Sequence, residues 1–164
     1  MFKEITAILA VALTFYGFLP YIRSILRNET KPHVFSWVIW GVTTFIVFFA
    51  QHASRGGIGS WLIGISGIIT SFIALLAYLK RSDTTITTAD WVFLIAAFSA
   101  LPFWFFASDP LWAVMILTIV DTIGFAPTVR KAYAHPHEEK IGLFGIFIIR
   151  NLLVILALEH YSFA

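Results

Sequence analysis

Two charged residues lie deep inside long apolar stretches of the sequence. Asp121 precedes Val129 by eight residues and Arg150 follows Ile141 by nine, so each lies about 12–13 Å from one end of its stretch at about 1.5 Å per residue. A carboxyl group can gain or lose a proton, whereas a guanidinium stays charged and binds anions. Because the depths match, we expect either a structural ion pair or a site where Asp121 responds to protons or cations and Arg150 is its partner or an anion contact.

Polar and aromatic side chains accompany these charges. With Asp121 and Arg150, the candidates for a solute or ion pathway are Thr14, Trp37, Trp40, Thr118, Thr122 and Asn151. Trp37 and Trp40 share a helix face, so they either stack on a sugar or other planar solute or fill a contact between helices. Hydroxyl groups in membrane helices commonly bond to the backbone or to a neighbouring helix. That packing role is expected for most of Thr43, Thr44, Ser66, Thr70, Ser71 and Ser99.

The chain as a whole has too little polar surface for a soluble domain. Of its 164 residues, 59% are hydrophobic and 12% are charged, against about 25% charged in soluble domains. An integral membrane protein is therefore expected. The absence of cysteine excludes disulfides, thiolate metal sites and a cysteine nucleophile, and a net charge of +2 is too small for a nucleic-acid-binding surface. The sequence holds no His-Glu-x-x-His, Gly-x-Ser-x-Gly or phosphate-binding glycine loop, so no catalysis, metal or other cofactor is expected.

Six apolar stretches are long enough to cross a bilayer as helices. A bilayer core of roughly 30 Å needs about 20 apolar residues in a helix, with a working range of about 17–25. The stretches are Ile5–Ile22, Val34–Ala50, Ile58–Leu79, Trp91–Ala107, Leu111–Val129 and Ile141–Leu158. They lack the alternation typical of β-strands, so the pattern predicts an all-α, polytopic transmembrane bundle of six helices.

Most basic residues lie on one side of the predicted spans. Eight fall in the loops after the first, third and fifth spans: Arg23, Arg27, Lys31, Lys80, Arg81, Arg130, Lys131 and Lys140. On the opposite side lie Lys3 and Arg55. Because loops rich in lysine and arginine stay in the cytoplasm, loops 23–33, 80–90 and 130–140 are predicted to be cytoplasmic and both termini outside. The expected location is a bacterial inner membrane.

A short motif occurs at the end of two spans. Residues 17–23 and 124–130 both read Gly-Phe-x-Pro-x-x-Arg at an offset of 107 residues, and a basic loop with Pro and His follows each copy. Both copies face the same way across the membrane, which predicts a parallel internal repeat, as in some transporters. Pro20 and Pro127 interrupt the backbone hydrogen bonds of their helices, so they are expected to be matched hinges.

The sequence resembles the PQ-loop superfamily, which includes the SWEET sugar carriers and their half-size bacterial relatives. The resemblance is carried by the paired prolines, the basic loops, the Lys-Pro-His segment at 31–33 and the Ser-Trp pair at 36–37. The resemblance implies two three-helix bundles joined by a linker helix, with a solute site between them. On this basis residues 1–80 form the first bundle, 81–107 a cytoplasmic loop and the linker helix, and 108–164 a second, incomplete bundle.

The chain departs from that family in two ways. Tyr21 and Thr128 stand where the family has a glutamine after each signature proline. No seventh helix completes the second bundle, and an incomplete bundle exposes polar walls to lipid, which is costly. The expected explanations are a homo-oligomer, a partner helix that completes the bundle, or a sequence that is cut short.

The repeat, the paired prolines and the polar groups at mid-membrane depth together predict a carrier. It is expected to move a small polar solute across the bilayer by alternating access, and Asp121 makes a proton-linked mechanism one form of this. The alternative is a non-transporting membrane subunit, such as an assembly factor or a receptor-like binder, whose helices serve packing alone. The sequence does not identify the solute.

Overall fold

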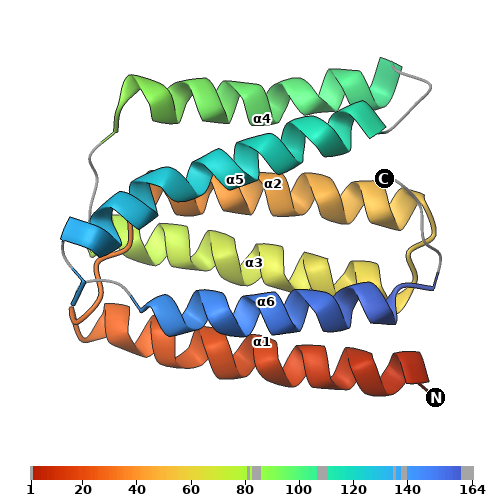
Figure 1. The fold of residues 1–164 in the computed structure, drawn as a ribbon, viewed down its shortest axis with the longest axis horizontal. Coiled ribbons are helices and arrows are strands. Elements are labelled where there is room, and N and C mark those ends of the chain that lie inside the picture. The colour runs from red at the N-terminus through yellow and green to blue at the C-terminus, as the bar shows by residue number, and fades with distance from the viewer. Residues whose placement is uncertain are drawn as a thin grey trace.

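The described part of the chain folds into six α-helices. The computed structural model describes residues 2–80, 82, 86–106, 111–134, 136–137 and 140–159, and no strand occurs within these ranges. The helices are α1 (Phe2–Leu26), α2 (Val34–Ala53), α3 (Ile58–Leu79), α4 (Thr88–Phe106), α5 (Leu111–Ala134) and α6 (Ile141–Ala157) (Figure 1). The all-α class and the number of helices predicted from the sequence are therefore confirmed.

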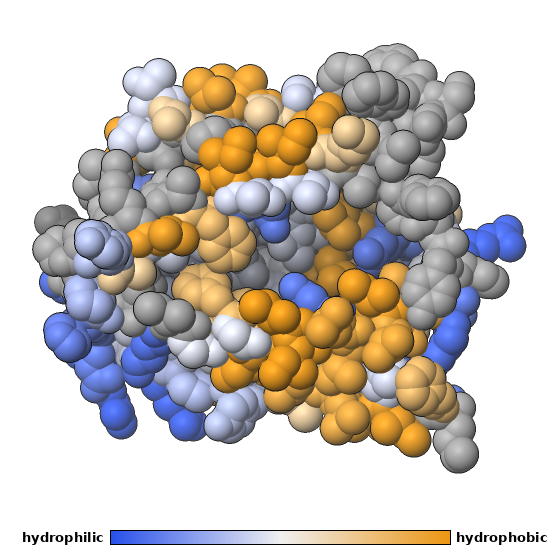
Figure 2. Space-filling view, in the orientation of Figure 1, coloured by the Kyte–Doolittle hydropathy of each residue, from blue (hydrophilic) through white to orange (hydrophobic). Residues whose placement is uncertain are grey.

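Three of the described helices, α1, α2 and α3, are long and apolar enough to cross a membrane. The apolar parts found in α5 and α6 are shorter, at Met115–Phe125 and Gly142–Ala157. Large apolar side chains such as Ile8, Ile68 and Ile148 are more than 60% exposed, and Figure 2 shows apolar side chains over wide parts of one face. An exposed apolar surface of this kind suits lipid. The chain is an integral membrane protein.

The ends of the helices differ from the ends of the apolar stretches. α3 covers Ile58–Leu79 as predicted, whereas α1 and α5 continue four and five residues beyond Ile22 and Val129. Hydropathy marks the part of a helix that suits lipid, and the backbone can stay helical beyond it. Pro20 and Pro127 consequently lie inside α1 and α5, and not at their ends. The hinge expected at these prolines stays a prediction.

The order in which the helices pack differs from their order along the chain. α3 contacts both α1 and α2, α6 packs along α1 and also contacts α3, and α5 packs on α2 and α4 (Figure 1). Within the described residues, α5 and α6 do not pack along one another, although they are consecutive. These contacts cross the predicted boundary between residues 1–80 and 108–164, and the division into two bundles stays a prediction.

Glycines allow α2 and α3 to approach each other closely. A Cβ atom at Gly41 would lie 2.8 Å from Oγ of Ser71, and one at Gly64 would lie 2.9 Å from the ring of Phe48. Real Cβ atoms do not come so close, so a larger residue at either position would force Ser71 or Phe48 to shift. The tight α2–α3 pair forms the wall of a cavity that lies between α5 and α6.

Candidate solute-binding site

A cavity of about 750 Å³ is lined by residues of α1, α2, α3, α5 and α6. Its polar lining residues are Thr43, Thr44, Gln51, Ser66, Thr70, Thr118, Asp121, Arg150 and Asn151. Figure 2 shows a hollow near the middle of the molecule, between the α5 side and the α6 side, with polar side chains at its base. Small-molecule pockets typically have volumes of about 300–1,000 Å³. The cavity is therefore large enough for a small solute.

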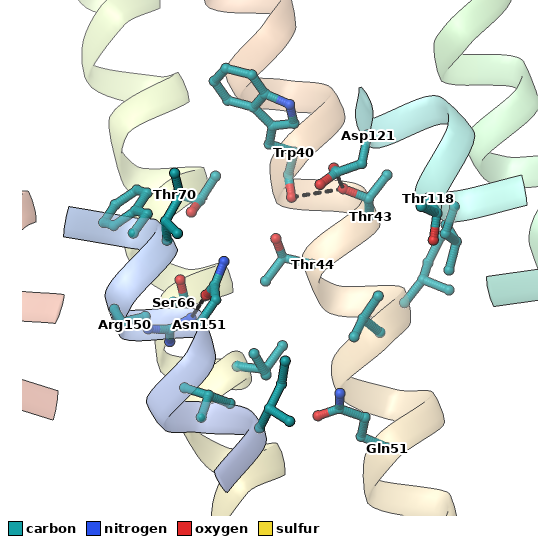
Figure 3. A pocket seen from close by; sticks show the side chains of 18 of the residues that line it. Trp40, Thr43, Thr44, Gln51, Ser66, Thr70, Thr118, Asp121, Arg150 and Asn151 are labelled. Carbon is teal, nitrogen blue, oxygen red and sulfur yellow. Dashed lines mark hydrogen bonds between the residues drawn. The ribbon is translucent and has the colours of Figure 1, made fainter. Parts of the chain in front are cut away.

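Asp121 faces the cavity from α5 (Figure 3). Its Oδ1 accepts a hydrogen bond of 2.9 Å from the hydroxyl of Thr43. The same hydroxyl lies 3.2 Å from the carbonyl oxygen of Trp40, and with a single hydrogen it donates fully to one acceptor at a time. Within the described part of the chain, Asp121 has no ion-pair partner and no other hydrogen bond. Most of the hydrogen-bonding capacity of this carboxyl group is thus unused.

Arg150 faces the same cavity from α6, and only 4% of the residue is exposed. Its Nε donates to Oγ1 of Thr14 at 3.0 Å. Its two terminal nitrogens donate to Oδ1 of Asn151 at 2.8 Å and to the carbonyl oxygen of Leu62 at 2.9 Å. All three acceptors are neutral, and no carboxylate among the described residues pairs with this guanidinium. Arg150 therefore brings an uncompensated positive charge to the cavity wall.

Asp121 and Arg150 do not form the ion pair that their matching depth suggested. That expectation assumed that consecutive helices are neighbours, which is wrong here because α6 packs on α1 and α3 while α5 packs on α2 and α4. The two charges instead lie on opposite sides of the cavity, with Thr44 of α2 between them (Figure 3). A structural pair between α5 and α6 is thereby excluded, and the alternative of two separate contacts for a ligand remains.

Aromatic rings close the end of the cavity nearest the α1–α2 and α5–α6 loops. The ring of Trp40 on α2 lies 4.6 Å from that of Phe125 on α5 and 6.1 Å from that of Phe144 on α6, measured between centroids. The rings of Phe125 and Phe144 are 5.5 Å apart, which joins α5 to α6 at this end. Trp37 lies edge-on to Trp40 at 5.4 Å. Both tryptophans therefore line the cavity and also fill helix contacts.

The other candidates from the sequence occupy different places. Thr118 and Asn151 line the cavity, whereas Thr14 is buried and holds Nε of Arg150. Thr122 is exposed, is not among the lining residues, and donates its hydroxyl to the carbonyl oxygen of Thr118 at 2.7 Å. Adjacent residues of a helix point about 100° apart, so the neighbour of a cavity residue readily faces elsewhere.

Several cavity residues were not singled out for a site from the sequence. They are Thr43, Thr44, Gln51, Ser66 and Thr70. The hydroxyls were expected to serve helix packing, because a uniformly apolar helix gives no sign of which face meets a cavity. Gln51 follows the predicted end of its span directly, and its Oε1 is buried without a hydrogen bond from any described residue. Of the two hinge candidates, Pro20 does not line the cavity, and the side chain of Pro127 lies outside the described part of the chain.

Hydrogen bonds on the two sides of the cavity correspond at the repeat offset. Arg150 donates to Thr14, which joins α6 to α1. The residues 107 positions away from these two are Thr43 and Asp121, which bond to each other and join α2 to α5. Each bond links a threonine to a charged residue. The charge is positive at one bond and negative at the other.

Aromatic contacts correspond in the same way. Phe18 on α1 lies 4.6 Å from Phe147 on α6, between ring centroids. The residues at the offset of 107 are Phe125 on α5 and Trp40 on α2, and these rings are also 4.6 Å apart. The contact of α1 with α6 and the contact of α5 with α2 therefore place aromatic residues at positions that correspond at this offset.

Comparison with known proteins gives no assignment: no family model matches the chain, and neither a curated protein nor a solved structure is significantly similar to it. The geometry of the cavity is therefore the basis for proposing a function.

Proposed function

We propose that this protein is a membrane carrier for a small polar solute. The observation that carries the proposal is the cavity, in which Asp121 and Arg150 present opposite charges from α5 and α6 without pairing to each other. Charged residues at membrane depth are costly and are typical of substrate and ion pathways. Helices that served packing alone would be expected to pair these charges or to lack them.

The proposal includes a parallel repeat that relates α1 and α2 to α5 and α6. The corresponding hydrogen bonds and ring contacts at the offset of 107 residues support it. Transporters built from repeats place their solute sites between the repeated units, which is where the cavity lies. A relationship to the PQ-loop superfamily is part of the same proposal and is supported by the sequence motifs alone.

Alternating access requires that the two ends of the cavity open in turn. Aromatic rings close the end near the α1–α2 and α5–α6 loops. At this end the contact between the rings of Phe125 and Phe144 joins α5 to α6. Separation of these two rings, with Pro20 and Pro127 as hinges, would open this end. Because the described parts of α5 and α6 pack on other helices and meet each other through these rings, this end is well suited to such a motion.

The rival function is a non-transporting membrane subunit, either an assembly factor or a receptor-like binder. Counterflow uptake into proteoliposomes, with a panel of sugars, amino acids and nucleosides, separates the two. We expect uptake of at least one panel member above protein-free vesicles. We also expect Asp121→Asn to remove any dependence of uptake on pH between 5 and 8, because Asp121 supplies the carboxyl group among the described residues that line the cavity. If no panel member is taken up or bound, the rival is favoured.

The orientation proposed for the protein has its basic loops in the cytoplasm and both termini outside, across six spans. Single cysteines report it directly because the chain has none of its own. A membrane-impermeant thiol reagent applied to intact bacteria should label Ala53→Cys, at the end of α2, and should label Tyr133→Cys, near the end of α5, only after lysis. The reverse pattern would contradict this orientation.

A second copy of the chain, or another helix, is proposed to cover the opening between α5 and α6. α3 contacts α1 and α2, so its counterpart in the repeat would contact α5 and α6. None of the described helices takes that place, and the hollow in Figure 2 lies there. A monomer in lipid nanodiscs that binds the solute as tightly as the protein in proteoliposomes would contradict this part of the proposal.

A further inference from the structure

The charged residues that line the cavity indicate which chemical class of solute fits it. Asp121 and Arg150 are opposite in sign, lie on opposite sides of one space and leave each other unpaired. From this arrangement we infer that the solute is a zwitterion of the α-amino acid type, whose carboxylate binds Arg150 and whose ammonium group binds Asp121. The inference rests on the proposed function, since it names the class of solute that the carrier would move.

The guanidinium of Arg150 is suited to bind a carboxylate. A guanidinium has five N–H donors, and three of them are used on Thr14, Asn151 and Leu62. These bonds fix the plane of the group, and its two other N–H donors have no partner among the described residues. Because a guanidinium and a carboxylate match in geometry and charge, a bound carboxylate would supply the missing anion.

Asp121 is suited to an ammonium group on the other side. Its carboxyl group accepts a single hydrogen bond among the described residues, from Thr43. An ammonium group has three donors and no acceptor, so it can use the remaining acceptor sites of Asp121 together with nearby hydroxyls. Thr44 and Thr118 line the same space (Figure 3). A bound ammonium group would supply a cation that the described residues do not provide.

Other classes of solute compensate at most one of the two charges. A neutral sugar would compensate neither Asp121 nor Arg150, and a simple cation would leave Arg150 unpaired. A simple anion would compensate Arg150 alone, so that Asp121 would either stay uncompensated or take up a proton. An unpaired charge is costly in a closed site within a membrane. A zwitterion compensates both and adds no net charge to the closed cavity.

The asymmetry of the repeat supports a fixed direction of binding. The contacts of α1 with α6 and of α5 with α2 correspond, yet the charged residue is positive in one and negative in the other. A solute with different groups at its two ends therefore fits in one orientation. The rings of Trp40, Phe125 and Phe144 at the closed end favour an apolar amino-acid side chain there.

A ligand series on the unmodified protein tests the inference. Purified protein in nanodiscs is titrated with the twenty standard L-amino acids, with glucose, and with two analogues of L-phenylalanine, namely 3-phenylpropanoate, which lacks the ammonium group, and 2-phenylethylamine, which lacks the carboxylate. If another amino acid binds best, its own deaminated and decarboxylated analogues replace these two. We expect an amino acid to bind and each analogue to bind at least about tenfold more weakly, since each leaves one charge unpaired.

Two variants assign the ends of the solute. Arg150→Gln should weaken binding of the amino acid and leave binding of the amine unchanged, whereas Asp121→Asn should weaken binding of the amino acid and leave binding of the acid unchanged. Thr122→Val is the matched control, because Thr122 is next to Asp121 but exposed. This crossed pattern cannot arise from general unfolding, because each variant still binds one ligand. If a variant does not fold, the series on the unmodified protein decides alone.

The possible results separate this inference from the proposed function. Uptake of a sugar or a nucleoside without binding of any amino acid would overturn the inference and leave the carrier function standing. Binding of an amino acid in the expected series without counterflow would support the zwitterion site and overturn the carrier function. An amino acid that binds no more tightly than both of its analogues would overturn the inference.

Discussion

Replacing Arg150 with glutamine is expected to abolish solute uptake without destabilising the protein. A charged side chain at the centre of a membrane helix costs about 2.5–3.5 kcal/mol, and no described carboxylate compensates Arg150. Its acceptors also keep other partners. Thr14 donates to the carbonyl oxygen of Ala10 at 2.7 Å, and the carbonyl of Leu62 lies within α3, where it accepts a helical N–H. Removal of the guanidinium therefore leaves few polar atoms without a hydrogen-bond partner.

The measurement is the unfolding midpoint in detergent together with counterflow uptake per folded molecule. We expect the midpoint of Arg150→Gln to equal or exceed that of the unmodified protein, and uptake to fall to the level of protein-free vesicles. Arg150→Lys is the control, because lysine retains the positive charge, with the free-energy cost of burying that charge in the membrane, but lacks the planar guanidinium. A large fall in the midpoint of Arg150→Gln would show that Arg150 is required for folding and would remove the main support for a solute contact.

Replacing Gly17 or Gly124 with leucine is expected to separate helices that the cavity needs in contact. A Cβ atom at Gly17 would lie 3.2 Å from Leu143 and 3.3 Å from Phe147, and one at Gly124 would lie 3.3 Å from Nε1 of Trp40. A single added carbon is already tight at these distances, and leucine adds three more carbons to it. Overpacking typically costs about 1–3 kcal/mol. Both variants should lower the unfolding midpoint.

Gly145 provides a matched control for these substitutions. It lies inside α6, is exposed, and a Cβ atom there would have no neighbour within 4 Å. Leucine is a better helix former than glycine, so Gly145→Leu should leave the midpoint unchanged or raise it slightly. Gly17 and Gly124 are 107 residues apart, so similar losses at both would support the repeat. A midpoint for either variant equal to that of Gly145→Leu would contradict the close contact.

The helices could be predicted from the sequence because membrane insertion constrains each stretch separately. About 20 apolar residues without strand-like alternation are sufficient to predict a helix, whatever its neighbours are. α3 agrees with its prediction at both ends. The misplaced ends of α1 and α5 have the same origin, since apolar character reports contact with lipid and the helices continue beyond it to Leu26 and Ala134.

The depth of the charged groups was also accessible from the sequence. Counting residues from the ends of two apolar stretches was sufficient to single out Asp121 and Arg150, and both line one cavity. What the count could not supply was the direction of each side chain. Both Thr118 and Thr122 are exposed, yet Thr118 lines the cavity and Thr122 does not, and no sequence signal separates two threonines on a helix that is apolar all round.

The sequence by itself determined which stretches are helical, that the chain belongs in a membrane, and which charged residues lie deep in these stretches, because these properties depend on single stretches of chain. The neighbours of each helix were decided by tertiary structure alone. α6 packs on α1 and α3 instead of on α5 because small residues such as Gly17 allow that approach. This choice keeps Asp121 and Arg150 apart and converts an expected ion pair into two unpaired charges that face one cavity.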